Sequence, residues 1–190
     1  MTSISLPDTT GHLTRYTLTG VPIETPEGPH DFNRIAFSAA HVVADPFSAR
    51  EPSIGPAIDW DATLAYRRRL LDLGLGIAEA MDTAQRGGGL DWPGALELIT
   101  HSLQAAKPEE RDRIFSGIGT DHLLPSDARS IDDVIRAYLE QVEAVQKRGG
   151  RMIMMASRAL ARVANSAKEC ETVYTKVLAA CDKQIGRAHV

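Results

Sequence analysis

The chain has 190 residues, of which 43% are hydrophobic and 24% charged, and its formal net charge is −4. This size and balance are typical of one soluble globular domain, and the slightly acidic charge gives no reason to expect nucleic acid as a partner. No apolar run reaches the ~20 residues that a membrane span needs, and the N-terminus lacks the basic start and apolar core of a signal peptide. We therefore expect a cytoplasmic protein with no membrane partner.

Residues 1–33 form an N-terminal extension rich in Thr, Pro and Gly. Within it, HLTRYTL and VPIE flank Thr19-Gly20 and are predicted to pair as a β-hairpin. The core domain is expected to occupy residues 34–184.

Four apolar segments of the core domain are each followed by a helical segment with a polar cap, which is the pattern of parallel strand–helix units. The predicted strands cover about 35–43, 75–81, 114–118 and 152–156. The predicted helices begin after Asp59, near Asp91, after Ser130 and after Ser166, with a short helical turn at RALARVA. Four units are half of a closed (β/α)8 barrel. The predicted fold class is therefore α/β, a truncated TIM barrel of about four βα units with the N-terminal hairpin closing one end.

The last six residues, IGRAHV, follow the final predicted helix where a fifth strand would begin. They resemble the translation of a sequencing-adapter oligonucleotide. We therefore expect residues 185–190 to be a non-native tail and the chain to be a fragment of a longer protein; the alternative is an ordinary polar tail.

Polar side chains gather where each predicted strand ends, which is where the active site of a barrel lies. His41 follows the first strand, and Glu79 interrupts the apolar second strand, so Glu79 must be paired or functional if it is buried. These two are the catalytic candidates. The binding candidates near the strand ends are Thr83, Gln85, Arg86, Gly117, Gly119, Thr120, Asp121, Ser157 and Arg158.

Each candidate also has a structural interpretation. His41 can donate to a loop carbonyl, Asp82 can pair with Arg86, and Asp121 can cap a turn. Arg86 and Arg158 can hold a carboxylate or phosphate in a bidentate manner, although loop arginines are more often solvated.

Metal and nucleotide sites have weaker support. His41, Glu79, Asp82, Asp121 and His122 could together hold a divalent metal, but no ligand spacing supports this. GIGTDH carries His122 where the third glycine of a dinucleotide motif would stand. We expect no cofactor.

Five segments in this order, AHVVADP, IDWDATLAYRRRLLDLG, EAMDTAQR, GIGTD and MMASRALAR, resemble the dihydrodipicolinate synthase and N-acetylneuraminate lyase superfamily. They look still more like a bacterial family of unknown function described as dihydrodipicolinate-synthase-like, over about residues 33–183. The resemblance implies an eight-stranded barrel that cleaves or forms carbon–carbon bonds in 2-oxo acids through a Schiff base. The imine-forming lysine would lie on a sixth strand, which this chain does not contain.

The resemblance carries over to individual residues only in part. It implies that Thr83 contacts the substrate carboxylate, but Ala84 stands where a second threonine is expected. Gly117 and Gly119 match a G-x-G turn, whereas Ala156-Ser157 replaces a tyrosine.

The function expected on these grounds is that of a fragment of a lyase or aldolase acting on a 2-oxo acid or similar small carboxylate, the fragment itself being inactive. The alternative is a non-catalytic small-molecule-binding or metal-dependent barrel. Self-association through the open edges of the sheet is also expected.

Overall fold

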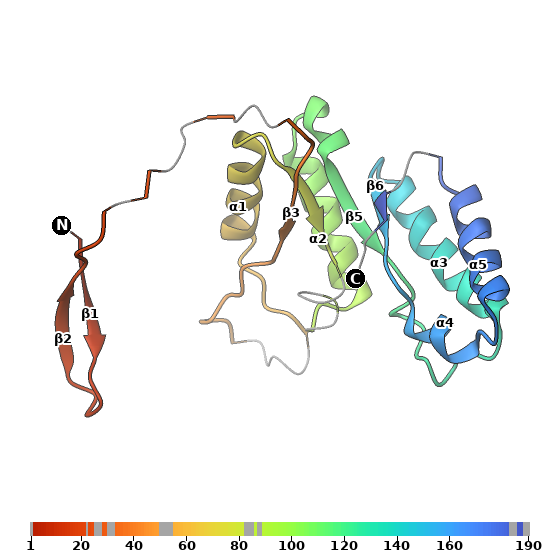
Figure 1. Ribbon diagram of the computed structural model, residues 1–190, viewed down its shortest axis with the longest axis horizontal. Helices are drawn as coiled ribbons and strands as arrows, with labels where there is room; N and C mark the ends of the chain where they lie inside the picture. Colours follow the sequence, from red (N-terminus) through yellow and green to blue (C-terminus); the bar gives the residue numbers. More distant parts are fainter. Residues whose placement is uncertain are drawn as a thin grey trace.

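The structure is a computed structural model that describes residues 2–21, 23–24, 28–29, 33–49, 55–81, 86 and 89–182, and the backbone of 186–187. It contains a two-stranded antiparallel hairpin and a parallel sheet with helices packed against it (Figure 1). The chain therefore has the predicted mixed α/β architecture. The expected tail at 185–190 lies outside the described residues, except for two backbone positions.

The hairpin pairs β1 (Ser3–Pro7) with β2 (Leu13–Thr17). The predicted pairing of the second segment with VPIE is not observed, because a turn inside the extension directs the chain back earlier. The Asp8 side chain accepts hydrogen bonds from the backbone N–H groups of Thr10 and His12, at 2.8 and 3.0 Å. Gly11 completes the turn at a positive φ of 86°, a conformation that glycine adopts without strain.

The parallel sheet has the strand order β3-β4-β5-β6-β7, so that each strand pairs with the next one in the chain. The bounds are β3 (Phe37–Ala40), β4 (Gly76–Glu79), β5 (Ile114–Ile118), β6 (Arg151–Met154) and the two-residue β7 (Gly186–Arg187). The first four lie within or close to the predicted strands. The described strands form an open sheet and do not close into a barrel.

The helices are α1 (Trp60–Asp72), α2 (Trp92–Ala105), the 3-10 helix η2 (Pro108–Arg113), α3 (Ile131–Gln146), α4 (Arg158–Val163) and α5 (Ala167–Ala179). The predicted N-caps are in place. Asp59 accepts from the Ala62 N–H, and Ser130 accepts from the Asp133 N–H. Because a side-chain oxygen at the N-cap satisfies an otherwise unpaired helical N–H, these residues fix where each helix begins.

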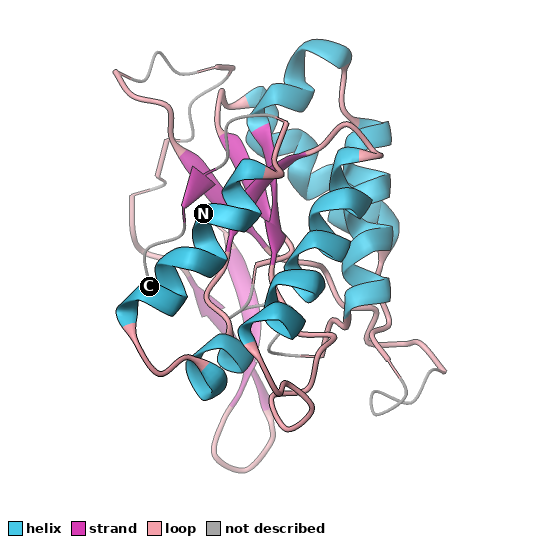
Figure 2. Ribbon diagram, turned by 90° about the vertical axis from the view of Figure 1, so that its right-hand side faces the viewer, coloured by secondary structure: helices cyan, strands magenta, loops and turns pink. Residues whose placement is uncertain are grey.

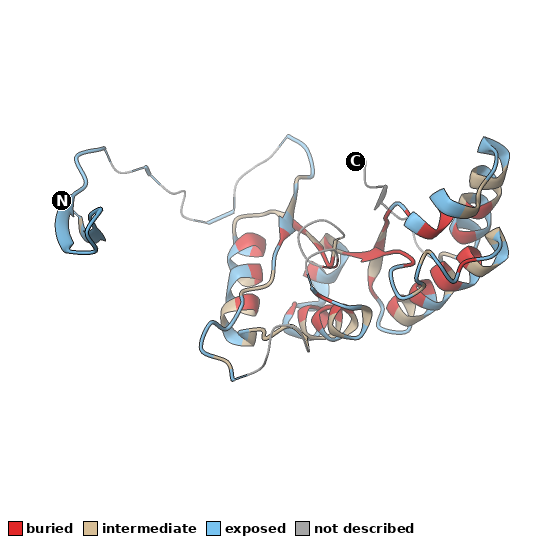
Figure 3. Cartoon of the chain, turned by 90° about the horizontal axis from the view of Figure 1, so that it is seen from below, coloured by how far each residue is buried: buried red, intermediate tan, exposed pale blue. Residues whose placement is uncertain are grey.

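The two faces of the sheet are covered differently. Figure 2 shows the helices lying on one side of the strands, and Figure 3 shows the buried residues concentrated between the helices and the sheet. Sequential parallel strands with right-handed crossovers place all their connecting helices on one face. On that face Ile77, Ile118 and Met152 are fully buried.

The opposite face, which we call the open sheet face, is covered by none of the described helices. The strand registers place on it the side chains of Phe37, Ala39, Ala78, Phe115, Arg151 and Ile153. Phe37 and Ala39 are exposed, and the other four are half-buried. Phe37 and Phe115 make an edge-to-face contact at 4.9 Å between ring centroids. The open sheet face thus combines apolar side chains with one cation, Arg151, whose guanidinium lies 5.8 Å from the centroid of the Phe115 ring and pairs with Asp112 at 2.9 Å.

Candidate functional site

A cavity of about 550 Å³ lies at the carboxyl ends of β5 and β6. It contains six of the predicted binding residues, drawn from three separate segments of the chain. The residues that line it are Arg86, Gly119, Thr120, Asp121, Leu123, Leu124, Pro125, Met155, Ala156, Ser157, Arg158, Ala159 and Ala161. The structure thus brings together side chains that the sequence placed after three different strands.

Two glycines allow the strand ends to approach closely at this point. A Cβ atom on Gly117 would overlap the Ala80 carbonyl oxygen, and one on Gly119 would lie 3.1 Å from the Met155 Cε atom. The Met155 N–H donates to the Ile118 carbonyl at 2.9 Å, which joins the two strand ends beside the cavity. Packing therefore requires both glycines, but the expected G-x-G turn is not observed, because Gly117 lies within β5 and Gly119 directly follows its last residue. Gly117 supports the wall of the cavity without lining it.

Arg86 is buried, and its guanidinium donates hydrogen bonds to other groups of the protein. Its side chain is 1% exposed. Nε donates to Asp121 Oδ2 at 3.0 Å, Nη1 donates to the Gly117 carbonyl at 2.7 Å, and Nη2 contacts Asp121 Oδ1. The guanidinium also lies 5.0 Å from the centroid of the Trp92 ring, a cation–π arrangement. Arg86 thus pairs with the carboxylate of Asp121, whereas the sequence had suggested that it could bind the carboxylate of a ligand.

Asp121 presents a negative charge at the rim of the cavity, with one third of its side chain exposed. Burial raises the pKa of this carboxyl. The charge of Arg86 and the hydrogen bonds from Arg86 and Gln141 outweigh that effect and hold the pKa below its usual value. Asp121 is therefore ionised at neutral pH and favours a ligand group that donates a hydrogen bond.

Gln141 of α3 connects these groups, although it was not among the predicted site residues. Its Oε1 accepts from Arg86 Nη2 and from the Gly119 N–H, both at 2.7 Å. Since both partners can only donate, the orientation of the amide is determined. Its Nε2 lies 3.0 Å from Asp121 Oδ1 and 2.8 Å from His122 Nδ1. The signal in the sequence was a polar residue on the apolar stripe of the helix, three positions after Tyr138.

Thr120 and Ser157 place two hydroxyl groups in the cavity wall. Their Oγ atoms lie 2.6 Å apart, and both residues are buried. Ser157 also accepts from the Leu160 N–H at 2.9 Å as the N-cap of α4. The pair links the end of β5 to the start of α4.

Arg158 is the cation that faces the cavity from its exposed side. It is the first residue of α4, directly after Ser157, and is exposed. Within the described part of the chain, its guanidinium has no recorded acceptor or ion-pair partner. It therefore differs from Arg86, which the protein holds on several sides.

Glu79, predicted as catalytic, lies on the helix-covered face of the sheet and is fully buried. Its Oε2 accepts from Arg67 Nε at 3.0 Å and from Ser102 Oγ at 2.6 Å, and Ser116 Oγ lies 3.4 Å from Oε1. Burial raises the pKa of Glu79, while the charge of Arg67 and the two serine hydroxyls oppose that rise. Glu79 lines neither of the two larger cavities, and its partners join α1, α2, β4 and β5. These contacts indicate that Glu79 stabilises the fold.

His41 and the loop after β4 complete the predicted set. The His41 side chain is exposed and lines neither cavity, while its carbonyl accepts from Arg67 Nη1 at 3.0 Å. Thr83 and Gln85, together with Asp82 and Ala84, lie outside the described residues. His41 is therefore not brought to the cavity.

The expected alternative of a metal site has no counterpart in the described residues, where no group of three His, Cys, Asp or Glu side chains is arranged to hold a metal. His122 pairs instead with Glu140, at 3.0 Å between Nε2 and Oε2. Within the same described part, no helix is long and apolar enough to cross a membrane.

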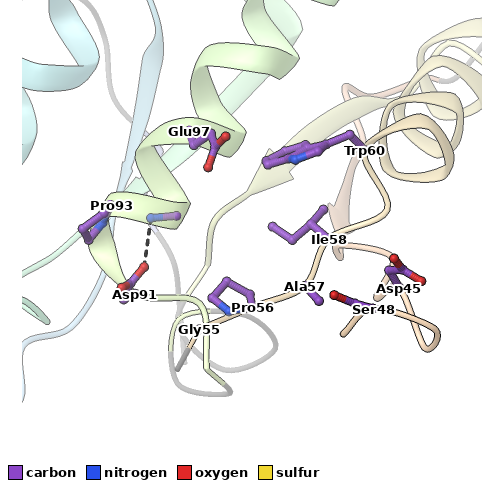
Figure 4. A pocket seen from close by; sticks show the side chains of 11 residues that line it. Asp45, Ser48, Gly55, Pro56, Ala57, Ile58, Trp60, Asp91, Pro93 and Glu97 are labelled. Atoms are coloured by element: carbon purple, nitrogen blue, oxygen red, sulfur yellow. Dashed lines mark hydrogen bonds between the residues drawn. The ribbon is translucent and has the colours of Figure 1, made fainter. Parts of the chain in front are cut away.

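A second hollow of about 410 Å³ lies between the segment after β3 and the start of α2 (Figure 4). Trp60 and Ile58 form its apolar wall, and Asp91 and Asp45 lie at its edges. Asp91 accepts from the Gly94 N–H as the cap of α2, and Asp45 accepts from the Phe47 N–H. Asp45 and Asp91 thus serve local turns, while Glu97, which also lines the hollow, lies 3.8 Å from His101 one turn further along α2. None of the predicted site residues lies in this hollow.

Comparison with solved structures finds similarity to the one described as "PhdJ bound to substrate intermediate", at 10% sequence identity and a TM-score of 0.43. The similarity covers 80% of this chain and 58% of that chain. This chain thus spans less than two thirds of the length of that solved structure. No curated protein matches the sequence.

The family model described as "Protein of unknown function (DUF993)" matches residues 4–186. This finding corrects the predicted resemblance, because nothing in the comparisons indicates a dihydrodipicolinate synthase family. The resemblance depended on the order of strands and helices, which many unrelated α/β proteins share. The matched residues span nearly the whole chain, and the chain therefore belongs to the DUF993 family.

Proposed function

We propose that this chain binds a small molecule bearing a carboxylate in the cavity at the ends of β5 and β6. The observation that carries the proposal is Arg158, a cation on the cavity wall that has no recorded partner among the described residues. A carboxylate beside Arg158 would gain a charge-assisted hydrogen bond, which is shorter and stronger than a neutral one.

The remaining wall supports a ligand with one acidic end and one neutral end. The Thr120 and Ser157 hydroxyls offer polar contacts, and Met155, Leu123 and Ala159 offer apolar surface. The ionised Asp121 would repel a second carboxylate and attract a hydroxyl or amino group. A cavity with apolar walls and a few placed polar groups is the usual form of a small-molecule site.

Binding alone is the function proposed for this chain. A carbon–carbon lyase or aldolase step through an imine needs a lysine at the bound ketone. None of the described lysines, Lys107, Lys147, Lys168 and Lys176, lines the cavity. The lyase reaction on a 2-oxo acid accordingly has no support from the described residues.

We also propose that the sheet is one arc of a (β/α)8 barrel. Its support is the sequential strand order and the position of the helices on one face only. In such a barrel the cavity would lie at the carboxyl-terminal mouth, where barrel sites form.

Calorimetric titration with pyruvate, and with pyruvamide as its uncharged counterpart, tests the binding proposal. We expect pyruvate to bind more tightly than pyruvamide, and Arg158→Gln to weaken pyruvate binding at least about tenfold, because a charge-assisted hydrogen bond contributes ~1.5–3 kcal/mol. Arg162→Gln is the matched control, since Arg162 lies in the last turn of the same helix and does not line the cavity. Equal binding of pyruvate by wild-type and Arg158→Gln protein would contradict the proposal.

A further inference from the structure

The carboxylate of Asp121 can accept one more hydrogen bond at the cavity. A carboxylate offers about four acceptor positions. Neighbouring side chains of the described chain fill three of them: Oδ1 contacts Arg86 Nη2 and accepts from Gln141 Nε2 at 3.0 Å, and Oδ2 accepts from Arg86 Nε at 3.0 Å. Asp121 lines the cavity with one third of its side chain exposed. Oδ2 therefore has a position left for a ligand group that donates a hydrogen bond.

The charge state of Asp121 determines which ligand group fits beside it. Asp121 is ionised at neutral pH, and an ionised carboxylate can only accept hydrogen bonds. A hydroxyl group of a ligand can donate to Oδ2, and that hydrogen bond would be charge-assisted. A ketone oxygen can only accept, so two electron-rich oxygens would face each other. The wall beside Asp121 thus favours an alcohol over a ketone.

The charges around the cavity favour a ligand with a single negative charge. Of the described residues that line it, Arg86 and Arg158 are cations and Asp121 is an anion, which leaves one net positive charge. Arg86 is buried against Asp121 and already balances its charge. A monocarboxylate would balance Arg158. An amino acid carries no net charge and would bring its ammonium group close to the buried Arg86, where repulsion between cations is weakly screened.

An apolar part of the wall is available for the rest of the ligand. Leu123, Leu124, Pro125, Met155 and Ala159 contribute to it. Leu124 is 60% exposed and would be withdrawn from water by an apolar group lying against it, which is favourable. The volume of about 550 Å³ is typical of sites that enclose ligands much larger than pyruvate. An acid with an apolar side chain therefore fits this cavity better than pyruvate does.

We propose that the cavity selects a monocarboxylic hydroxy acid with an apolar side chain. The hydroxyl group of this ligand donates to Asp121, its carboxylate pairs with Arg158, and its side chain packs against Leu124. The inference rests on the proposed function, because it names the class of ligand that the same cavity takes. A hydroxy acid differs from the 2-oxo acid expected from the sequence in the group that meets Asp121.

Calorimetric titration of the full chain with four acids that differ only at C2 tests this preference. The acids are 2-hydroxy-4-methylpentanoate, with each enantiomer measured separately, its 2-oxo counterpart, 4-methylpentanoate and leucine. We expect one enantiomer of the hydroxy acid to bind about tenfold more tightly than either the oxo acid or 4-methylpentanoate. This factor is the lower end for a hydrogen bond to a charged group, because Asp121 is partly exposed. Leucine should bind more weakly than the hydroxy acid.

Two variants separate the roles of Asp121 and Arg158. Asp121→Asn should bring the affinities for the hydroxy acid and the oxo acid to within about twofold of each other, because an amide can donate to a ketone as well as accept from a hydroxyl. Arg158→Gln should weaken all four acids and keep their order, because it removes a contact that they share. Asp127→Asn is the matched control and should change nothing, since Asp127 is exposed in the same loop and does not line the cavity. A cooperative thermal transition checks that each variant folds, and the wild-type order of the four acids decides alone if Asp121→Asn does not fold.

Three results would contradict the preference for a hydroxy acid. Failure of the wild type to bind any of the four acids would overturn the proposed function and this inference with it. Binding of the oxo acid or leucine at least as tightly as the hydroxy acid would overturn the inference alone and leave carboxylate binding intact. A preference for the hydroxy acid that persists in folded Asp121→Asn protein would also overturn it, because a group other than Asp121 would then accept from the hydroxyl.

Discussion

At the scale of single residues, Gln141 organises the cavity without touching its open space. It is fully buried, and its amide meets Arg86, the Gly119 N–H, Asp121 and His122. Asp121 owes its position to Arg86 and Gln141 together. The cavity wall thus depends on Gln141, a residue that is missed when only acidic, basic and nucleophilic side chains are considered as site candidates.

Replacing Gln141 by Leu is expected to lower the free energy of unfolding by about 1–3 kcal/mol, because the Gly119 N–H and one N–H of Arg86 would lose their acceptor inside the protein. Urea denaturation measures the change. Gln104→Leu on the exposed side of α2 is the control and should fall within ~0.5 kcal/mol of the wild type. A Gln141→Leu protein as stable as that control would show that water satisfies these groups.

Gln141 and Glu79 also show what the sequence could and could not predict about the site. Polar residues at strand ends were predicted to converge, and five of them, with Gly119, line one cavity, because the carboxyl ends of neighbouring parallel strands lie side by side. The inward or outward direction of Glu79 was not predictable in the same way. The sequence of an apolar strand does not show which face of the sheet its one polar residue occupies. In the structure, Glu79 lies on the face where it can pair with Arg67 of α1.

At the scale of elements, one buried and one half-buried ion pair connect α1 to its neighbours. Arg67 joins α1 to β4 through Glu79, and Arg68 joins α1 to η2 through Glu110, at 2.7 and 2.6 Å from its two terminal nitrogens. Successive arginines thus serve two different neighbours of the helix. Runs of charged residues usually form a solvated helix face. In Arg67-Arg68-Arg69 only Arg69 is exposed.

The Arg68–Glu110 pair predicts acid sensitivity. The hydrogen bond from Arg68 lowers the pKa of Glu110 from 4.5 to about 2, against the opposing effect of burial. A carboxyl whose pKa is lower in the folded state stabilises the fold fully above its unfolded value, and this contribution is lost as the pH falls through the folded value. Stability from this pair should therefore decline between pH 4.5 and about 2.

Urea denaturation of wild type and Glu110→Gln at a series of pH values isolates this contribution from other carboxyls. The stability difference between the two proteins should be constant above about pH 5.5 and shrink steadily toward about pH 2. Asp72→Asn is a control, because Asp72 is a half-exposed partner of the same Arg68. A difference that does not change with pH would mean that Glu110 titrates normally in the folded state.

At the scale of the whole molecule, the order of strands and helices could be predicted because each boundary has a local cause. Asp59, Asp91, Ser130 and Ser166 cap their helices as expected. The hairpin register could not be predicted from apolar runs alone, since the Asp8 turn competes with the Thr19-Gly20 turn for the same strand.

The hairpin and the parallel sheet differ in what stabilises them, which makes a prediction for the dynamics of the whole chain. Backbone amides of β1 and β2 should exchange with solvent much faster than those of β5, because a two-stranded hairpin is at best marginally stable in water, whereas β5 is paired on both sides, with β4 and β6. Hydrogen–deuterium exchange measures both sets of amides, and hairpin amides as strongly protected as those of β5 would contradict the prediction.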